Sequence, residues 1–352
     1  MSRRNESLTR RWWRRARTIP AVLVLALLAV VLLPVTALIA LIADLVGGFR
    51  RRRWLRLLGM VTTYLVIETI VIFVALLLWI GTGFGVGIHT EWGQRPHRAI
   101  QLWWAGRIVR AIEFFFSTSI RIDGDGVVTP GPVIAFARHT SYGDAALPMF
   151  ILGTRNGLHL RYVLKRETTL IPALDLYGNR LPNHFVDRAA SDRGNELDAI
   201  RELVTGLDEH SAAVIFPEGT FRTEATFARA IERLDESDPQ RAARVRNLRH
   251  LLPARPGGSL TILDAAHEAD VVIIAHRGFE AFTSVAAIVA NVPFDGPVDV
   301  NMWRVPRATI PTTPDARMDW LDGQWERLDA WVEESAPPDT ASESATADRG
   351  ST

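Results

Sequence analysis

The sequence predicts an α/β protein whose mixed, mostly parallel sheet is flanked by helices and preceded by two N-terminal membrane helices or a re-entrant hairpin. Two observations carry this prediction. The first third of the chain holds two long runs that are almost free of charge, Ile19–Ala43 and Val61–Ile88. From Ile120 onward, short apolar runs alternate with helical stretches, the pattern of strands joined by helices.

Each of the two apolar runs is long enough to cross a bilayer, which requires about 20 apolar residues. Ile19–Ala43 carries no charge, and Val61–Ile88 is interrupted only by Glu68. A buried core helix is the alternative, but two such runs in succession favour a membrane protein. A cleaved signal peptide fits poorly, because the first run exceeds a usual hydrophobic region and no A-x-A site follows it. The stretch Thr9–Trp13 resembles a twin-arginine signal, but further arginines follow it and favour a cytosolic basic tail.

The topology of these segments has two solutions. Arginines crowd both the N-terminal tail and the connector Phe49–Leu58. Two full spans place one of these clusters outside, against the positive-inside tendency. A hairpin that turns near Pro34 keeps both clusters at the anionic cytoplasmic surface. Either way, we expect the rest of the chain to lie at the cell membrane, with its catalytic domain facing the cytoplasm.

The chain divides into six predicted regions. They are a basic N-terminal tail (1–18), membrane segments with a basic connector (19–90, the segments being 19–46 and 61–88), an interfacial amphipathic helix (91–119), a catalytic domain (120–312), a C-terminal helix (313–334) and a disordered polar tail (335–352). For the tryptophan-rich and arginine-rich region 91–119, packing onto the catalytic domain is an equal alternative to the membrane interface.

Within the catalytic domain, seven short apolar runs predict strands: IRIDG, PVIAFA, LRYVLK, NHFVD, AAVIFP, VVIIAH and VDVNMWRV. Four stretches predict helices: Asp192–Glu209, Thr223–Asp235, Ser259–Glu268 and Asp315–Glu334. The glycine-rich Gly81–Gly87 is not a dinucleotide-binding fingerprint, because the third glycine of G-x-G-x-x-G falls on Val86 and no short strand precedes it.

Composition excludes several classes of function. The net charge is +1, so no bulk attraction to nucleic acid is expected. The absence of cysteine excludes disulfides, thiolate nucleophiles and cysteine-based zinc sites. There is no serine nucleophile elbow, no Walker sequence and no histidine pair at ligand spacing, so we expect no bound metal.

The stretch ARHTSYGDAALP carries the first candidate site. An apolar run, PVIAFA, ends just before His139, and Asp144 follows five residues later. Histidine can take a proton from a hydroxyl near neutral pH when a carboxylate fixes its tautomer and stabilises the imidazolium. The pattern H-x-x-x-x-D alone is also compatible with a structural histidine.

Two further stretches end strands with charged residues. In AAVIFPEGTFRTE, a strand ends at Pro217–Thr220 and a helix starts near Arg222, where glycine, helix-start amides and an arginine favour an anion. In NHFVDRAASDRGNE, a strand delivers Arg188 to a loop at a helix start. The alternatives are an ordinary strand-to-helix turn and solvated arginines.

Together these stretches resemble the glycerolipid acyltransferases, the 1-acylglycerol-3-phosphate O-acyltransferase family. Its blocks read H-x-x-x-x-D, F-x-x-R, E-G-T-R and a hydrophobic strand with proline. They appear here as His139–Asp144, Phe185–Arg188, Phe216–Thr220 and the region from Leu251 onward. The stretches HLLPARPGGSL and VDVNMWRVPRATIP look closest to the lysophospholipid and lysocardiolipin acyltransferase branch. The resemblance covers roughly residues 131–311.

The resemblance implies a glycerol-3-phosphate acyltransferase-like fold and a function. His139 would deprotonate the hydroxyl of a lysophospholipid, with 1-acylglycerol-3-phosphate as the leading acceptor, as that hydroxyl attacks an acyl thioester. Asp144 would orient the imidazole, and no acyl-enzyme would form. The residues implied to hold the acceptor's phosphate and shape its pocket are Arg188, Glu218, Gly219, Thr220 and Arg222, with Lys165 as a further candidate. The implied partners are membrane lipids, the lysophospholipid acceptor and acyl-CoA or acyl carrier protein as co-substrate, with no other cofactor.

The chain departs from the family pattern at three places. Arg138 stands where asparagine is common, Phe221 separates Thr220 from Arg222, and Ala254 stands where the branch has arginine. These departures affect the phosphate contacts, and so the identity of the acceptor, more than the acyl-transfer chemistry. Another phospholipid or glycolipid acceptor, a lipid hydrolase using the same residues on water, and a non-catalytic scaffold are the alternatives.

Overall fold

The computed structural model describes residues 6–141, 144, 146–186, 193–294 and 296–334. Within them, seven strands form one sheet in the order β1-β7-β6-β2-β5-β3-β4. Neighbouring strands are parallel except for β6 and β7, which confirms the predicted mixed, mostly parallel sheet. The strands are β1 (Ile120–Asp123), β2 (Val133–Ala137), β3 (His159–Lys165), β4 (His184–Val186), β5 (Ser211–Ile215), β6 (Asp270–Arg277) and β7 (Val298–Val305).

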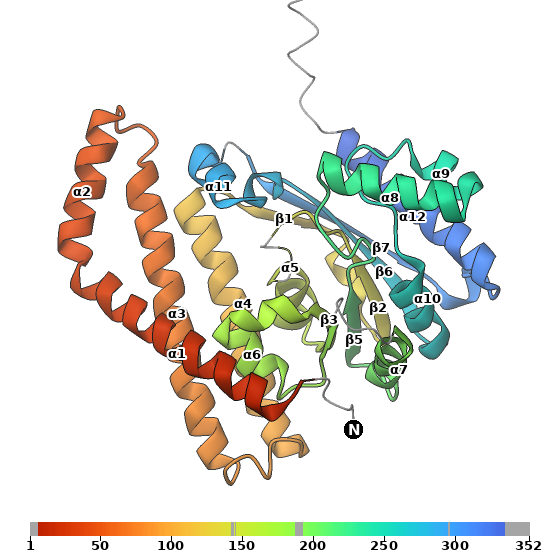
Figure 1. The fold of residues 1–352 in the computed structure, drawn as a ribbon, viewed down its shortest axis with the longest axis horizontal. Helices are drawn as coiled ribbons and strands as arrows, with labels where there is room; N and C mark the ends of the chain where they lie inside the picture. The colour runs from red at the N-terminus through yellow and green to blue at the C-terminus, as the bar shows by residue number, and fades with distance from the viewer. Residues whose placement is uncertain (1–5, 142–143, 145, 187–192, 295, 335–352) are drawn as a thin grey trace, which may run out of the picture.

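Helices cover both faces of this sheet (Figure 1). In β2, Val133 and Ala135 point into one hydrophobic core, whereas Ile134 and Phe136 point into the other. The first core is closed by α3 (Arg53–Gly81), α4 (Glu91–Phe116) and α6 (Pro172–Gly178). The second is closed by α7 (Arg193–Val204), α10 (Pro256–Ala265) and α12 (Pro314–Glu333). Burial on both faces explains why the central strands are continuous apolar runs.

Several shorter helices lie outside the predicted set. They are α5 (Ala146–Pro148), α6, α9 (Pro239–Val245) and α11 (Val285–Asn291). The predicted helix at Thr223–Asp235 is α8 (Glu224–Ser237), whose first turn is closed by a capping box between Thr223 and Thr226.

The apolar N-terminal region forms a bent pair of helices followed by a long one. Helices α1 (Leu8–Val31) and α2 (Leu33–Val46) meet at Leu32 with a bend of 68°. Pro34 lies in the first turn of α2, where its missing N–H costs no hydrogen bond. By length and composition, α3 could cross a membrane, and so could α1 with α2 if the bent pair is one span.

Five of the arginines in the predicted N-terminal tail, Arg10, Arg11, Arg14, Arg15 and Arg17, belong to α1, which begins at Leu8. Arg14 Nη2 lies 2.7 Å from Asp175 Oδ1, and Arg15 Nε lies 2.9 Å from Asp175 Oδ2. Asp175 lies on α6 and is buried. The basic end of α1 is therefore fixed to the catalytic domain by buried ion pairs.

Glu68, the one charge inside the second apolar run, faces the catalytic domain. Its carboxylate accepts the indole N–H of Trp104 at 2.8 Å and the backbone N–H of Ala173 at 3.0 Å. The residue is completely buried where α3 meets α4 and α6. For region 91–119, one expectation was packing onto the catalytic domain. The structure shows such packing, because α4 lies between α3 and the sheet (Figure 1).

The C-terminal helix is tied to the loop that borders the sheet's carboxyl edge. Arg241 on α9 donates to both oxygens of Asp322 on α12, at 2.7 and 2.9 Å, and to the carbonyl of Ala254 at 2.6 Å. Both charged side chains are buried, so their desolvation is offset only while the pair is intact.

We expect Asp322→Ala to destabilise the fold by about 3–5 kcal/mol, because it leaves a buried guanidinium without its carboxylate. The control is Asp319→Ala, which breaks the exposed pair between Asp319 and Arg244 and should cost less than about 1 kcal/mol. Thermal unfolding of the purified protein in detergent measures both. Equal losses in the two variants would contradict this account.

Candidate active site

The predicted pair of His139 and Asp144 is brought together at the carboxyl edge of the sheet. His139 lies two residues beyond the end of β2, and its Nδ1 is 3.3 Å from Asp144 Oδ2. The Asp144 carboxylate also accepts the backbone N–H groups of Thr140 and Ser141 and the Ser141 hydroxyl. With Nδ1 facing the carboxylate, Nε2 is the ring atom positioned to take a proton.

The backbone of Arg138 and His139 is held by β6 on one side and by a residue beyond β5 on the other. The N–H of Arg138 donates to the carbonyl of Ile274 on β6 at 3.1 Å. The N–H of His139 donates to Glu218 Oε1, beyond β5, at 2.7 Å. The backbone that carries His139 is therefore fixed from both sides of β2.

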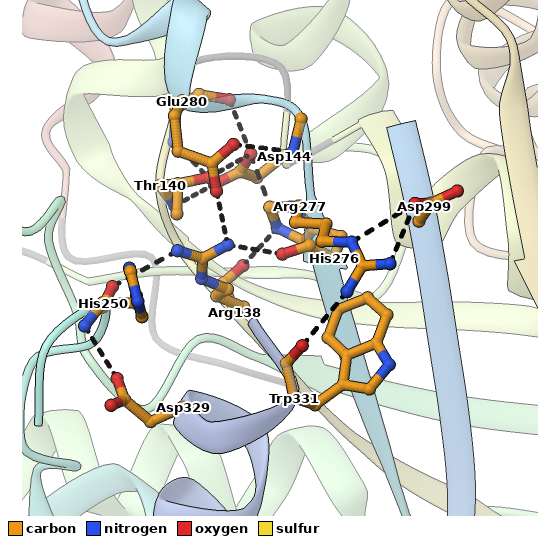
Figure 2. Close-up of polar contacts among 12 residues, drawn as sticks. Arg138, Thr140, Asp144, His250, His276, Arg277, Glu280, Asp299, Asp329 and Trp331 are labelled. Atoms are coloured by element: carbon orange, nitrogen blue, oxygen red, sulfur yellow. Dashed lines mark hydrogen bonds and ion pairs between the residues drawn. The ribbon is translucent and has the colours of Figure 1, made fainter. Parts of the chain in front are cut away.

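Arg138, which replaces the family's asparagine, is buried in a polar network (Figure 2). Its guanidinium donates to the carbonyl of His276, to Glu280 Oε1 at 2.7 Å and to the carbonyl of His250 at 3.3 Å. The side chain is only 2% exposed. Arg138 thus links β2 to β6 and to the loop before Leu251, rather than facing a ligand.

Glu218 holds the main chain through both of its carboxyl oxygens. Its second carboxyl oxygen accepts the N–H of Leu252 at 2.9 Å. Complete burial raises the pKa of Glu218 to about 8, against the lowering effect of the N–H donors of Leu252 and His139 and of nearby Arg138. Gly219 has a φ of +68°, which lets its N–H close a turn onto the carbonyl of Phe216 at 2.9 Å.

Two phenylalanines enclose the imidazole. The ring centres of Phe216 and Phe221 lie 4.8 and 4.5 Å from that of His139. Phe221 is the residue that interrupts the family's E-G-T-R block, so the departure supplies a wall of the site. Lys165 Nζ lies 5.0 Å from the centre of the Phe221 ring, which places this predicted residue beside the site.

The other predicted phosphate contacts are placed less directly. Arg222 Nη1 donates to Glu224 at 2.8 Å, and its guanidinium lies 4.7 Å from the centre of the Phe227 ring, so it is directed toward α8. Thr220 is partly buried in the turn before it. Arg188 lies outside the described residues. A phosphate-binding role for these residues stays a prediction.

The surroundings keep His139 neutral. Burial lowers the pKa of His139, an effect opposed by Asp144 and reinforced by the nearby charges of Lys165 and His276. A neutral imidazole at neutral pH is the form that can accept a proton.

His276 is a site residue that the sequence did not reveal. It is buried near the end of β6, with Nε2 at 3.1 Å from the carbonyl of Arg138 and 3.7 Å from Asp144 Oδ1 (Figure 2). Because Nε2 faces a carbonyl oxygen, it carries the proton. The one available signal was a histidine at the end of an otherwise apolar strand, VVIIAH.

Among the residues that the structure describes, no group of three or more histidine, aspartate or glutamate side chains is arranged to hold a metal ion.

Three comparisons with known proteins give matches to acyltransferases. Residues 119–276 match the family model described as acyltransferase. Lysophosphatidylinositol acyltransferase 10 of Caenorhabditis elegans is 22% identical over 254 residues, which cover 68% of this chain and 62% of that protein. The crystal structure of PlsC, the 1-acyl-sn-glycerophosphate (LPA) acyltransferase of Thermotoga maritima, matches with a TM-score of 0.46 and 14% identity, covering 78% of this chain and 97% of that one.

We expect His276→Phe to lower kcat by about 10- to 100-fold, because the carbonyl of Arg138 loses a buried donor worth roughly 1–3 kcal/mol. His276→Gln retains an amide donor and should stay within about threefold of wild type. Steady-state kinetics with a melting curve for each variant measure this. Equal activity of the phenylalanine and glutamine variants would show that the hydrogen bond does not position His139.

We expect Lys165→Met to move the acid limb of kcat/KM to higher pH. Lys165 helps to lower the pKa of His139, so removing its charge raises that pKa and protonates the base at a higher pH. Lys165→Arg keeps the charge and is the control. If both variants shifted the limb alike, or neither did, the electrostatic coupling would be refuted.

Proposed function

The chain belongs to the glycerolipid acyltransferase family, and we propose that it moves a fatty acyl group from acyl-CoA or acyl carrier protein to the free hydroxyl of a lysophospholipid. The acceptor proposed first is 1-acylglycerol-3-phosphate, which gives phosphatidic acid. The observation that carries the proposal is the His139–Asp144 pair, held at the carboxyl edge of a parallel strand.

In the proposed reaction, His139 Nε2 takes the proton of the acceptor hydroxyl while its oxygen attacks the thioester carbonyl. A carbon–oxygen bond forms, the carbon–sulfur bond breaks, and the imidazolium returns its proton to the leaving thiolate. Asp144 stabilises the transient imidazolium and keeps Nε2 directed at the substrate. No covalent acyl-enzyme is required, because the acceptor attacks the donor directly.

The N-terminal helices support a membrane arrangement in which α3 lies along one leaflet. Along α3, Arg56 donates to the carbonyl of Phe115, Glu68 bonds Trp104, and the carbonyl of Ala75 accepts from Arg180. These contacts span 19 residues, roughly 29 Å of helix, about the thickness of the hydrocarbon core. An upright α3 would submerge the flank of the catalytic domain, including Arg180, in lipid.

An in-plane anchor agrees with the apolar side chains that these helices leave exposed. On α3 they are Val61, Val66, Ile70, Phe73, Leu76, Leu77 and Ile80, and α1 and α2 add a further set that includes Val24, Leu27, Leu28, Val31, Leu38, Ile39 and Ile42. A surface of this extent is typical of a membrane contact. In this arrangement the acyl chains of both substrates stay in the leaflet while the reacting groups reach His139.

A second acceptor class has its own support. The similar Caenorhabditis elegans protein is named for lysophosphatidylinositol. In addition, Arg138 and Phe221 change two positions of the family pattern, and Arg222 is directed toward α8. Another lysophospholipid headgroup is therefore the alternative to 1-acylglycerol-3-phosphate.

We expect liposomes that contain labelled oleoyl-CoA and a panel of lysophospholipids to yield a diacyl product with the wild-type protein. His139→Ala should lower the rate by at least about 1,000-fold, because it removes the general base. Chromatography of the labelled lipids identifies the acceptor. Free fatty acid formed without any acceptor would indicate a hydrolase, and indifference of all turnover to His139→Ala would refute the proposed mechanism.

A further inference from the structure

A cavity lined by several charged side chains lies away from the His139–Asp144 pair, at the edge of the sheet formed by β4. Its volume is about 980 Å³, and its walls come from the start of α1, β3, the residues after α6, β4 and α7. Volumes of this size accommodate a ligand far larger than an inorganic ion. Nothing in the proposed chemistry of His139 uses this space.

The walls of the cavity carry more positive than negative charge. Among the described residues, four arginines line it, Arg11, Arg161, Arg166 and Arg180, against the two carboxylates of Glu6 and Glu202. Such a surplus of guanidinium groups in a concave, half-buried site attracts phosphate groups.

Within the described part of the chain, two of these arginines form no ion pair with a carboxylate. Arg161 donates to the backbone carbonyls of Leu203, Thr205 and Gly206. Arg180 donates to the carbonyl of Ala75 at 2.7 Å and contacts a ring nitrogen of His97. Burial lowers the pKa of both, that of Arg180 to about 10, so each remains charged at neutral pH. Carbonyls hold these side chains in place but leave their positive charge for a ligand.

The position of the cavity distinguishes between the two phosphate-bearing substrates. Arg166 follows Lys165 at the end of β3, and β5 separates β3 from β2, so the cavity begins roughly 10 Å from His139. In a lysophospholipid acceptor, only a few bonds separate the phosphate from the reacting hydroxyl. In acyl-CoA, the long pantetheine arm separates the reacting thioester from the phosphates of the nucleotide. The distance therefore suits the donor and not the acceptor.

We propose that this cavity binds the phosphorylated nucleotide of acyl-CoA, an inference that rests on the proposed acyl transfer. The pantetheine arm then runs past Lys165 and Phe221 to place the thioester beside His139. This assignment also selects acyl-CoA over acyl carrier protein as the donor, because the carrier protein attaches its pantetheine arm to a serine phosphodiester and has no adenine nucleotide.

The test uses adenosine 3′,5′-bisphosphate, which carries the nucleotide phosphates without thiol or acyl chain. Its binding to the full chain in detergent is measured by calorimetry, beside the kinetics with oleoyl-CoA. We expect Arg161→Gln, Arg166→Gln and Arg180→Gln each to weaken bisphosphate binding and raise KM for oleoyl-CoA by about tenfold, as expected for a charged hydrogen bond. The KM for the acceptor and kcat should stay within about twofold.

Matched variants distinguish weaker binding caused by loss of charge from weaker binding caused by loss of folding. Arg161→Lys and Arg180→Lys keep the charge and should stay within about threefold of wild type. Arg229→Gln, at an exposed arginine that also bonds a backbone carbonyl, is the control and should change neither constant. A melting curve for each variant identifies any that fails to fold, and three independent arginines keep the test decisive.

Each outcome bears on a different proposal. A rise in KM for the acceptor alone would assign the cavity to the acceptor headgroup and overturn the inference. Failure of the wild-type protein to bind the bisphosphate would overturn it as well. If the bisphosphate binds through these arginines while no lysophospholipid is acylated, the cavity assignment as a nucleotide site stands and the proposed function fails.

Discussion

The structure depends on how the backbone from Arg138 to Ser141 is fixed at the end of β2. The N–H of Arg138 is held by β6, the N–H of His139 by Glu218, and the next two N–H groups by Asp144. The backbone that carries His139, the proposed general base, is therefore fixed by hydrogen bonds from its own N–H groups. Buried donors and acceptors without partners cost free energy, so this arrangement resists change at each of its members.

The contacts that fix the backbone of His139 extend far from the imidazole. Glu218 holds Leu252, the loop continues to Ala254, and the carbonyl of Ala254 is held by Arg241, which is itself paired with Asp322 on α12. Helix α12 is thus connected to Glu218 through three contacts and the short loop from Leu252 to Ala254. The core on the α12 side of the sheet helps to keep this loop in place beside the backbone of His139.

The sequence predicted the sheet and the proximity of His139 and Asp144 well, because both leave local signals. Each of the seven apolar runs overlaps a strand, and the spacing of His139 and Asp144 suffices for the carboxylate to return to the ring. The contacts of Arg138, Glu218 and His276 were not predictable, because their partners come from strands and loops that only the folded sheet brings together.

Other misses have different physical causes. Short helices such as α9 lack the length that makes a periodic pattern visible. The basic stretch before Thr18 was assigned to a tail because its partner, Asp175, is more than 150 residues away. Composition cannot distinguish arginines that bind lipid headgroups from arginines that hold a helix to a domain.

The orientation inferred for α3 has a consequence for the membrane itself. An enzyme whose anchor lies along one leaflet releases its product into that leaflet only. New lipid then accumulates on one side, and the area of the two monolayers stays balanced only if lipid is moved across by another route. The contact of Glu68 with α4 and α6 holds α3 against the catalytic domain. In the proposed orientation, this contact would limit the addition of new lipid to one leaflet.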